Sequence, residues 1–381
     1  MRILYHHRIA SKDGQYVHVE ELTQALKRQG HEIIMVAPTL MEEHEFGRGS
    51  PMVARLKRHI PAGIYESLEL AYALVAFMQI LIQGLRHRPD FIYERYNLYL
   101  PAGAWASRLL KIPLLLEVNA PLFEERQRFN GIALPRLARW SEDHVWRRAH
   151  LALPVTQVLA ERMIARGVDP ERIRVIPNGI DTEKFQSFPD TQEAKAILNL
   201  SDRLVLGFTG FVREWHGLER VVDLLRDDPG HRHLLIVGDG PACASILERA
   251  KVLRVEDRVT ITGIIPRDQV ARYVAAFDIA LQPDVVDYAS PLKLFEYLAL
   301  GRAIVAPDKA NIREILAHEH NGLLFESENL DAFKQTVERL CDDAPLRERL
   351  SIQARNTIHE KKLTWDHNAT RVVEAAAGLI A

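Results

Sequence analysis

Apolar and polar positions along the chain follow two alternating patterns, one typical of strands and one typical of amphipathic helices. The first strand candidate, RILYHH, is followed by a helical stretch, VHVEELTQALKRQG, and by a second strand candidate, HEIIMVAP. Gly30 stands where this helix should end, because glycine accepts the left-handed conformation of a helix C-terminus. A strand, a helix and a strand in this order predict a parallel sheet.

The alternation continues in two blocks separated by a polar, turn-rich stretch. Further strand candidates of the first block are 91–94, 113–119, 151–155 and 173–178. Those of the second block are 204–210, 233–240, 259–263, 279–283, 303–307 and 322–325. We therefore expect an α/β protein with two Rossmann-like, doubly wound domains, 1–180 and 203–363, joined near 180–202. Ligands of such sheets bind at the carboxyl ends of the strands, and two facing sheets leave a cleft.

Length and composition agree with this expectation and narrow the classes of function. A chain of 381 residues is long for one hydrophobic core and suits two domains. The 47% hydrophobic residues, 26% charged residues and net charge of -2 are those of an ordinary globular protein and suggest no nucleic-acid partner. Cys243 and Cys341 lie in no zinc or redox motif, which favours a reducing cytosol. The first residues lack the apolar core of a signal peptide, so we expect a cytoplasmic location.

One apolar segment, 68–85, raises the question of a membrane. It contains Glu69, Gln79 and Gln83 and is marginal for a membrane span of about 20 residues, so a buried domain helix is the favoured interpretation. The basic stretch RLKRHIP, at 55–61, can contact anionic lipid, but an ordinary solvated charged stretch explains it at least as well.

Several loops after predicted strands carry candidate ligand groups. Gly14 follows the first strand, where a backbone can approach a phosphate, although a plain turn glycine is an equal alternative. Arg213 and His216, in TGFVREWHG, can hold a diphosphate; alternatively Arg213 pairs with a surface glutamate and His216 only caps. Asp239 is predicted to be the N-cap of a following helix. The main chain of Ile265 can meet a flat base, although an ordinary strand-to-helix connection explains this loop equally well.

The stretch YASPLKLFEYLALG, at 288–301, predicts a helix with an unusual first turn. If Ser290 is the N-cap and Pro291 is the first helical residue, Lys293 is the third, where the helix dipole disfavours a cation by up to about 1 kcal/mol. A bound phosphate would make this position favourable. Glu296 shares a face with Lys293 and can accept bonds from two ribose hydroxyls. The alternative is a structural Lys293–Glu296 salt bridge.

Metal chemistry has little support in the sequence. No DxD or HExxH motif and no His/Cys cluster at ligand spacing occurs. We therefore expect no metal and no cofactor, and a diphosphate neutralised by protein groups. The dinucleotide fingerprint GxGxxG is also missing, which argues against an ordinary NAD-dependent dehydrogenase.

Over nearly its whole length the sequence resembles the retaining glycosyltransferases of family 4, enzymes of the two-domain GT-B fold. The motifs that carry the resemblance keep the family's order and spacing: DGQYVHVEELTQALKRQGHEI, VIPNGIDTEKF, TGFVREWHG, LLIVGDGP, VTITGIIPRDQV and SPLKLFEYLALGRAIVAP. The final stretch from Thr364 is similar to the family's C-terminal helix (364–381), which crosses back onto the first domain.

The resemblance implies roles for individual residues. Glu296 matches the second glutamate of the family's EX7E motif, which holds the ribose of the sugar nucleotide. Gly14 matches a glycine that faces the phosphates, and Ile265 matches the position whose main chain meets the base. The loop and helix start around the diphosphate and sugar are matched by Ser290, Pro291, Leu292 and Lys293.

Three positions depart from the family pattern. The first glutamate of EX7E falls on Tyr288, so the usual contact to the donor sugar is missing. The Arg and Lys pair of the phosphate loop aligns with Phe211 and His216, which leaves Arg213 as the candidate substitute. Asn119 stands where many members carry a histidine beside the donor sugar.

The resemblance implies a retaining, metal-independent glycosyltransferase that moves a sugar from a nucleotide-diphosphate donor to a saccharide or lipid-linked acceptor. We expect Arg213, His216 and Lys293 to stabilise the leaving group, with Asn119 and Gly14 on the sugar side. Polysaccharide or glycolipid assembly, with peripheral contact at the inner membrane face, is the expected setting. A sugar-nucleotide epimerase and a noncatalytic sugar-nucleotide-binding protein are the alternatives.

Overall fold

The computed structural model describes residues 1–9, 14–38, 60–129, 131–185 and 188–380. The chain divides into two compact units, which are described separately. Unit 1 consists of Met1–Pro177, Tyr288–Ser290 and Trp365–Ala381, and unit 2 of Asn178–Asp287 and Pro291–Thr364. Of the basic stretch 55–61, residues 55–59 lie outside the described part of the chain.

Unit 1 is built on a five-stranded parallel sheet with the strand order β2-β1-β3-β4-β5. Its strands are β1 (Arg2–His6), β2 (Glu32–Val36), β3 (Phe91–Arg95), β4 (Leu114–Val118) and β5 (Leu151–Pro154). Its helices are α1 (Gly14–Arg28), α3 (Ala62–His87), α4 (Ala102–Leu110), α5 (Leu122–Phe129), α6 (Pro135–Arg148), α7 (Gln157–Ala165) and α16 (Trp365–Ile380), with a short 3-10 turn, η1 (Pro170–Arg172).

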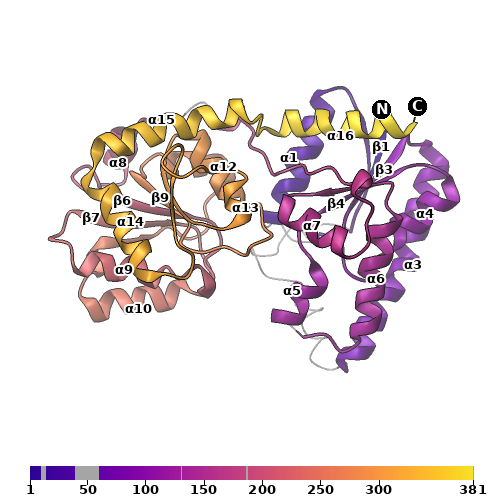
Figure 1. Cartoon of the computed structure of the whole chain (residues 1–381), viewed down its shortest axis with the longest axis horizontal. Helices are drawn as coiled ribbons and strands as arrows, with labels where there is room; N and C mark the ends of the chain where they lie inside the picture. Colours follow the sequence, from indigo (N-terminus) through magenta and orange to yellow (C-terminus); the bar gives the residue numbers. More distant parts are fainter. Residues whose placement is uncertain (10–13, 39–59, 130, 186–187, 381) are drawn as a thin grey trace. The chain divides into compact units, whose positions relative to one another are not determined.

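Helices cover the sheet of unit 1, so the apolar side chains of its strands are buried. Leu4, Ile92 and Leu116 are fully buried and share a core with Trp146 of α6. The last helix, α16 (yellow in Figure 1), packs against α1, where Arg28 forms an ion pair with Asp366 at 2.9 Å. Residues far apart in the sequence thus complete one unit.

Two predictions for unit 1 need correction. The segment 173–178 is no strand: the amides of Arg174 and Ile176 donate to β5, but Pro177 has no N–H to continue a ladder. The apolar segment 68–85 is part of α3, a crossover helix that packs on the sheet with Ala73, Ala76 and Ile80. Much of its aliphatic surface is exposed, so the prediction of a buried helix was wrong.

Unit 2 is built on a six-stranded parallel sheet with the order β11-β10-β9-β6-β7-β8. Its strands are β6 (Leu204–Thr209), β7 (Arg232–Val237), β8 (Val259–Ile261), β9 (Ile279–Leu281), β10 (Ala303–Pro307) and β11 (Leu323–Phe325). Its helices are α8 (Thr191–Ile197), α9 (Glu219–Arg226), α10 (Cys243–Leu253), α11 (Val270–Val274), α12 (Leu292–Ala299), α13 (Ala310–Arg313), α14 (Leu330–Asp342) and α15 (Ala344–Glu360), with the 3-10 turns η2 (Glu183–Phe185), η3 (Glu214–His216), η4 (Glu256–Arg258) and η5 (Arg267–Gln269).

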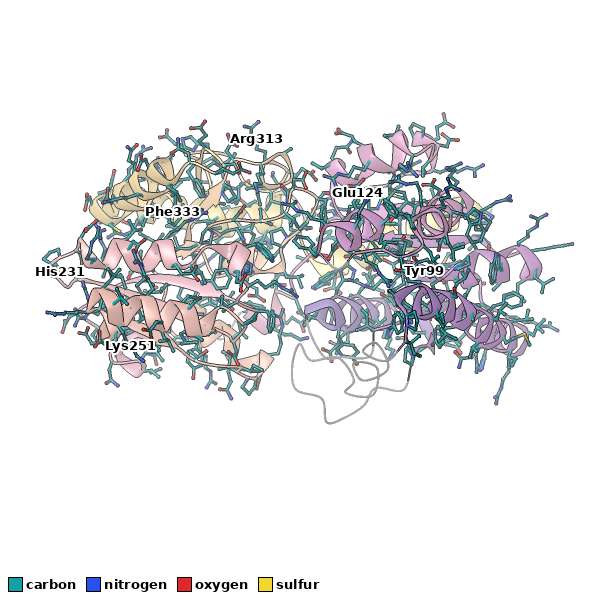
Figure 2. The ribbon with its side chains drawn as sticks, turned by 90° about the horizontal axis from the view of Figure 1, so that it is seen from below. Tyr99, Glu124, His231, Lys251, Arg313 and Phe333 are labelled. Atoms are coloured by element: carbon teal, nitrogen blue, oxygen red, sulfur yellow. The ribbon has the colours of Figure 1, made fainter. Side chains whose placement is uncertain are left out.

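In unit 2, too, apolar side chains of the strands and of the covering helices form the core. Phe333 of α14 is buried against Phe325 of β11, and in Figure 2 it lies among the packed elements, while Lys251 and His231 lie at the outer edge. Within the predicted connection 180–202, α8 is held to the sheet by Lys195, whose Nζ lies 2.6 Å from a carboxylate oxygen of Asp278. Two parallel, doubly wound sheets confirm the predicted α/β fold class.

Candidate functional site

The helix α12 presents the lysine singled out in the sequence. The helix begins at Leu292 and its N-cap is Pro291, with no side-chain cap, so the prediction of Ser290 as N-cap was wrong. The reason is local: Pro291 has an extended ψ of 117°, so the helix starts one residue later than expected. Lys293 is consequently the second helical residue, still in the first turn where the dipole disfavours a cation.

Lys293 lies against an aromatic ring and a histidine. Its Nζ is 3.7 Å from the centroid of the Phe208 ring and 3.5 Å from Nε2 of His216. Burial lowers the pKa of Lys293 to about 7, although Glu296 acts in the opposite direction. A lysine that is partly neutral near pH 7 is poised to gain a proton when an anion arrives.

His216 is held with one nitrogen toward this lysine. Its Nδ1 accepts the backbone amide of Arg213 at 3.1 Å, so the neutral ring carries its proton on Nε2. Burial, assisted by Lys293 and Arg213, lowers the pKa of His216 to about 2, which keeps the ring neutral. Nε2–H and the Lys293 ammonium are therefore two donors side by side, which an anion can satisfy together.

Arg213 lies in the same loop. Its guanidinium carbon is 5.1 Å from the centroid of the Phe211 ring. Glu219, a surface glutamate six residues after Arg213, accepts a hydrogen bond from Ser245 Oγ at 2.7 Å. His216 does cap the 3-10 turn η3, as its alternative role predicted, but only through Nδ1. The capping role thus leaves Nε2 available.

A glycine-rich turn after β7 supports this loop from behind. A Cβ on Gly240 would lie 2.1 Å from the carbonyl oxygen of Val212, and one on Gly238 would lie 2.1 Å from that of Gly210. Only glycine permits so close an approach of two chains. Asp239 was predicted to be the N-cap of the helix α10, but the N-cap is Ala242. The backbone carbonyl of Asp239 instead accepts a hydrogen bond from the Val212 amide at 2.9 Å.

Glu296 lies one turn deeper in α12 and is buried. Its Oε1 accepts a hydrogen bond from Nη1 of Arg267 at 2.6 Å, so the Lys293–Glu296 salt bridge considered as an alternative is replaced by another pair. Arg267 was missed by sequence reasoning. Its one signal is its place in IIPRDQV, two residues after Ile265, so that the loop predicted to meet the base leads into η5 beside Glu296.

Several of the remaining candidates belong to unit 1. Gly14 is the first residue of α1, and residues 10–13, directly before it, lie outside the described part of the chain. Tyr288 is buried: its carbonyl accepts a bond from Thr156 Oγ1 at 3.0 Å, and the Arg162 guanidinium lies 5.4 Å from its ring. Ser290 also belongs to unit 1, whereas Pro291, Leu292 and Lys293 belong to unit 2.

Asn119 is part of a buried polar cluster at the carboxyl end of β4. Its amide donates to Glu117, which also pairs with Arg95 and lies 2.9 Å from His18 Nε2. Burial alone raises the pKa of Glu117, but His18 and Arg95 outweigh it and hold the pKa well below its usual range. The cluster orients Asn119 and leaves its carbonyl oxygen as an acceptor. A glutamate within the apolar run LLLEVN was the sequence signal for it.

Within residues 1–9, 14–38, 60–129, 131–185 and 188–380, no group of three or more His, Cys, Asp or Glu side chains is arranged to hold a metal ion. Among the candidate residues of unit 2, Lys293 and Arg213 are cations and His216 is a neutral N–H donor, whereas Glu296 is the acidic residue.

The chain is similar to known glycosyltransferases in both halves. Residues 12–184 match the family model described as Glycosyltransferase Family 4, and residues 203–343 match Glycosyl transferases group 1. D-inositol 3-phosphate glycosyltransferase of Xylanimonas cellulosilytica is 25% identical, over 96% of this chain and 91% of that protein. A putative teichuronic acid biosynthesis glycosyltransferase, TuaC of Bacillus subtilis, is 23% identical over 86% of this chain and 85% of its own length.

Solved structures share the fold. Anabaena Alr3699/HepE, in its complex with UDP, superposes with a TM-score of 0.78 at 19% identity, over 99% of this chain and 100% of that chain. The predicted GT-B architecture is thereby confirmed. From the two family models, the relatives of similar length and the shared fold, we conclude that the chain belongs to the family 4 glycosyltransferases.

Proposed function

We propose that this glycosyltransferase moves a sugar from a nucleotide-diphosphate sugar to an acceptor hydroxyl with retention of the anomeric configuration. The observation that carries the proposal is the pair of donors formed by Lys293 Nζ, in the first turn of α12, and His216 Nε2 of η3, which lie 3.5 Å apart. Support for the donor class comes from Alr3699/HepE, whose structures contain UDP and UDP-glucose.

The leaving diphosphate would be stabilised by Lys293, His216 and Arg213, with the first amides of α12 behind them. Glu296 would bind the ribose with the oxygen that Arg267 does not use, and Ile265 would meet the base with its main chain. Gly14 and Asn119 would serve the sugar side. These cationic and N–H groups would supply the charge that a metal supplies elsewhere, so we propose that transfer is metal-independent.

Retention follows from the chemistry proposed for this site. The acceptor oxygen would attack the anomeric carbon on the face from which the diphosphate leaves, and the leaving phosphate oxygen would take the acceptor's proton. The protein then needs no nucleophile of its own: it positions the reactants and stabilises the negative charge that develops on the diphosphate.

The proposed setting is polysaccharide or glycolipid assembly at the cytoplasmic face of a membrane, with a saccharide or lipid-linked acceptor. The relative TuaC, named for teichuronic acid biosynthesis, supports an assembly role. An epimerase or a noncatalytic binding protein is less favoured, because the relatives and family models are those of transferases.

The test compares a nucleoside with its diphosphate. Lys293→Gln should weaken UDP binding by about 10-fold or more, the effect of losing one charge-assisted hydrogen bond, and should leave uridine binding unchanged. Lys334→Gln, an exposed lysine of α14, is the control. Calorimetry measures both affinities, with GDP and ADP as further ligands. Equal losses for uridine and UDP would contradict the assignment of Lys293.

A further inference from the structure

The helix α3 presents a wide aliphatic face to solvent. Seven of its large side chains are between 48% and 66% exposed: Ile64, Leu68, Leu74, Val75, Met78, Ile82 and Leu85. Most of them are spaced three or four residues apart, so they share one side of the helix. We call this set the α3 face.

Charged groups of the helix point away from this face. Between Ala62 and Leu85 the charged residues are Glu66 and Glu69. Glu66 is buried and accepts the Tyr99 hydroxyl at 2.9 Å, and Glu69 pairs with Arg126 at 2.6 Å. The α3 face therefore extends over about 24 residues, or roughly 36 Å, without a charge.

The other side of α3 is committed to unit 1. Ala73, Ala76 and Ile80 belong to the core that α3 forms with the strands of the sheet, and Gly84 packs against Leu110 of α4. By length and composition α3 is long and apolar enough to cross a membrane. However, it connects β2 to β3 of one sheet, so it cannot span a bilayer without leaving that sheet. It can only lie on a membrane, with the α3 face toward the lipid.

Basic side chains predominate around the α3 face. The acidic residues beside Arg88 interact with Arg2: Asp90 accepts a hydrogen bond from its backbone amide, and Glu32 pairs with its guanidinium. Exposed basic residues surround its C-terminal end: Arg86, Arg88, and Arg108 and Lys111 of the neighbouring α4. Arg136 of α6, which packs beside the N-terminal half of α3 (Figure 1), is also exposed. Within the described part of the chain, none of these residues forms an ion pair.

These charges distinguish between two occupants of the face. If two copies of the chain paired through α3, the predominantly basic margins would meet. The uncharged Ser67 and Gln79 would stand at the edges of the face, where paired helices carry complementary charges. An anionic lipid surface is complementary both to the aliphatic face and to its basic margin.

We propose that the α3 face docks the protein flat on an anionic lipid bilayer, which names the partner of the membrane-side role and rests on the function proposed above. The aliphatic side chains would enter the headgroup boundary, and the arginines and Lys111 would contact lipid phosphates.

Vesicle flotation of the full chain tests this docking. We expect binding to vesicles of phosphatidylglycerol and phosphatidylcholine in equal parts, and about 10-fold or greater loss of the partition coefficient in the double variant Ile82→Gln/Leu85→Gln. The matched control is Ile352→Gln/Val252→Gln in unit 2, because these side chains are 55% and 66% exposed, against 56% and 66% for Ile82 and Leu85. The control should bind like the wild type.

A second pair of variants isolates the charge. Arg86→Gln and Arg108→Gln should each lower binding to the anionic vesicles on the order of fivefold and leave binding to pure phosphatidylcholine unchanged. The proposal would be overturned if the wild-type protein bound neither the anionic nor the phosphatidylcholine vesicles. So would α3 variants that change the mass in sedimentation equilibrium but not the vesicle binding, since this result would assign the face to a second copy.

Failure of docking and failure of the proposed transfer give different results. Circular dichroism checks that each variant is folded, and UDP affinity should be the same in all four vesicle variants, whose residues lie outside the donor site. Vesicle binding without UDP binding would leave the α3 face as a lipid surface and remove the transferase proposal. UDP binding without vesicle binding would do the reverse.

Discussion

Lys293 shows how a single residue connects structure with ligand chemistry. Burial lowers its pKa to about 7, so near neutral pH the free protein holds part of this side chain without a proton. The diphosphate proposed to bind here would bring negative charge to Nζ and raise the pKa again. The complex would then bind more protons than the free protein, which would couple donor binding to protonation.

This coupling predicts a pH dependence of binding. UDP affinity should fall as the pH rises above about 7, by up to about 10-fold per pH unit, until the pKa of Lys293 in the complex is reached. Calorimetry near pH 8 in buffers of different ionisation enthalpy should show uptake of up to about one proton. Lys293→Met should abolish both effects, and an unchanged proton uptake in this variant would assign the coupling to another group.

Arg267 and Glu296 are expected to act as a pair. Arg267 donates to one oxygen of the buried Glu296 at 2.6 Å, and the other oxygen is the one proposed to bind the ribose. Glu296→Ala should weaken UDP about 10- to 100-fold, and Arg267→Ala should also weaken it, because the carboxylate loses its orientation. Neither variant should weaken the binding of inorganic pyrophosphate. A double-mutant cycle measures the coupling, and strictly additive losses would show that Arg267 acts independently of Glu296.

At the scale of elements, the loop 210–213, which leads to the residues proposed for the diphosphate, depends on the turn that follows β7. The loop 210–213 and the turn 238–240 approach closely enough that no side chain fits between them at Gly238 or Gly240. The amide of Val212 donates to Asp239 O, so the turn also fixes the course of the chain leading to Arg213 and His216. GDGP is thus a support for the site rather than a helix cap.

Gly240→Ala tests this support. The added Cβ would collide with the Val212 carbonyl, so we expect a loss of about 1–3 kcal/mol in the free energy of unfolding and a weaker UDP affinity. Gly378→Ala is the control, because a Cβ there meets nothing within 4 Å and replaces glycine inside α16. Denaturant unfolding compares the two, and a Gly240→Ala variant with normal stability and affinity would contradict the role of the turn.

At the scale of the whole molecule, the residues proposed for the site are divided between the two units. Unit 2 carries the donors proposed for the diphosphate together with Glu296, and unit 1 carries the buried cluster around Glu117 that orients Asn119. The chain passes between the units within the stretch 288–301, since Tyr288–Ser290 belong to unit 1 and the residues from Pro291 to unit 2.

If protein groups alone neutralise the leaving diphosphate, chelation should not matter. We expect EDTA to leave the rate of sugar transfer unchanged, and proton NMR of the product to show the anomeric configuration of the donor. Loss of transfer that only a divalent cation restores would contradict metal independence. An inverted product would contradict retention without affecting the binding roles of Lys293 and Glu296.

The sequence by itself determined the fold class and the positions of most elements, because burial on both faces of parallel strands leaves continuous apolar runs, as in β1, β4 and β10. It failed at 173–178, where apolar residues also occur but Pro177 interrupts pairing. It also identified Lys293 and Glu296 as candidates, since charged residues in a largely apolar helix require partners.

Only the tertiary structure decided what those partners are. Arg267 reaches Glu296 from another element, and His216 meets Lys293 across 77 positions of the chain, so local patterns contain no record of either contact. The same holds for the α3 face: composition alone suggests a buried or membrane-spanning helix. Its exposure is set by which side of α3 the sheet covers, and that depends on packing between strands and helices distant in sequence.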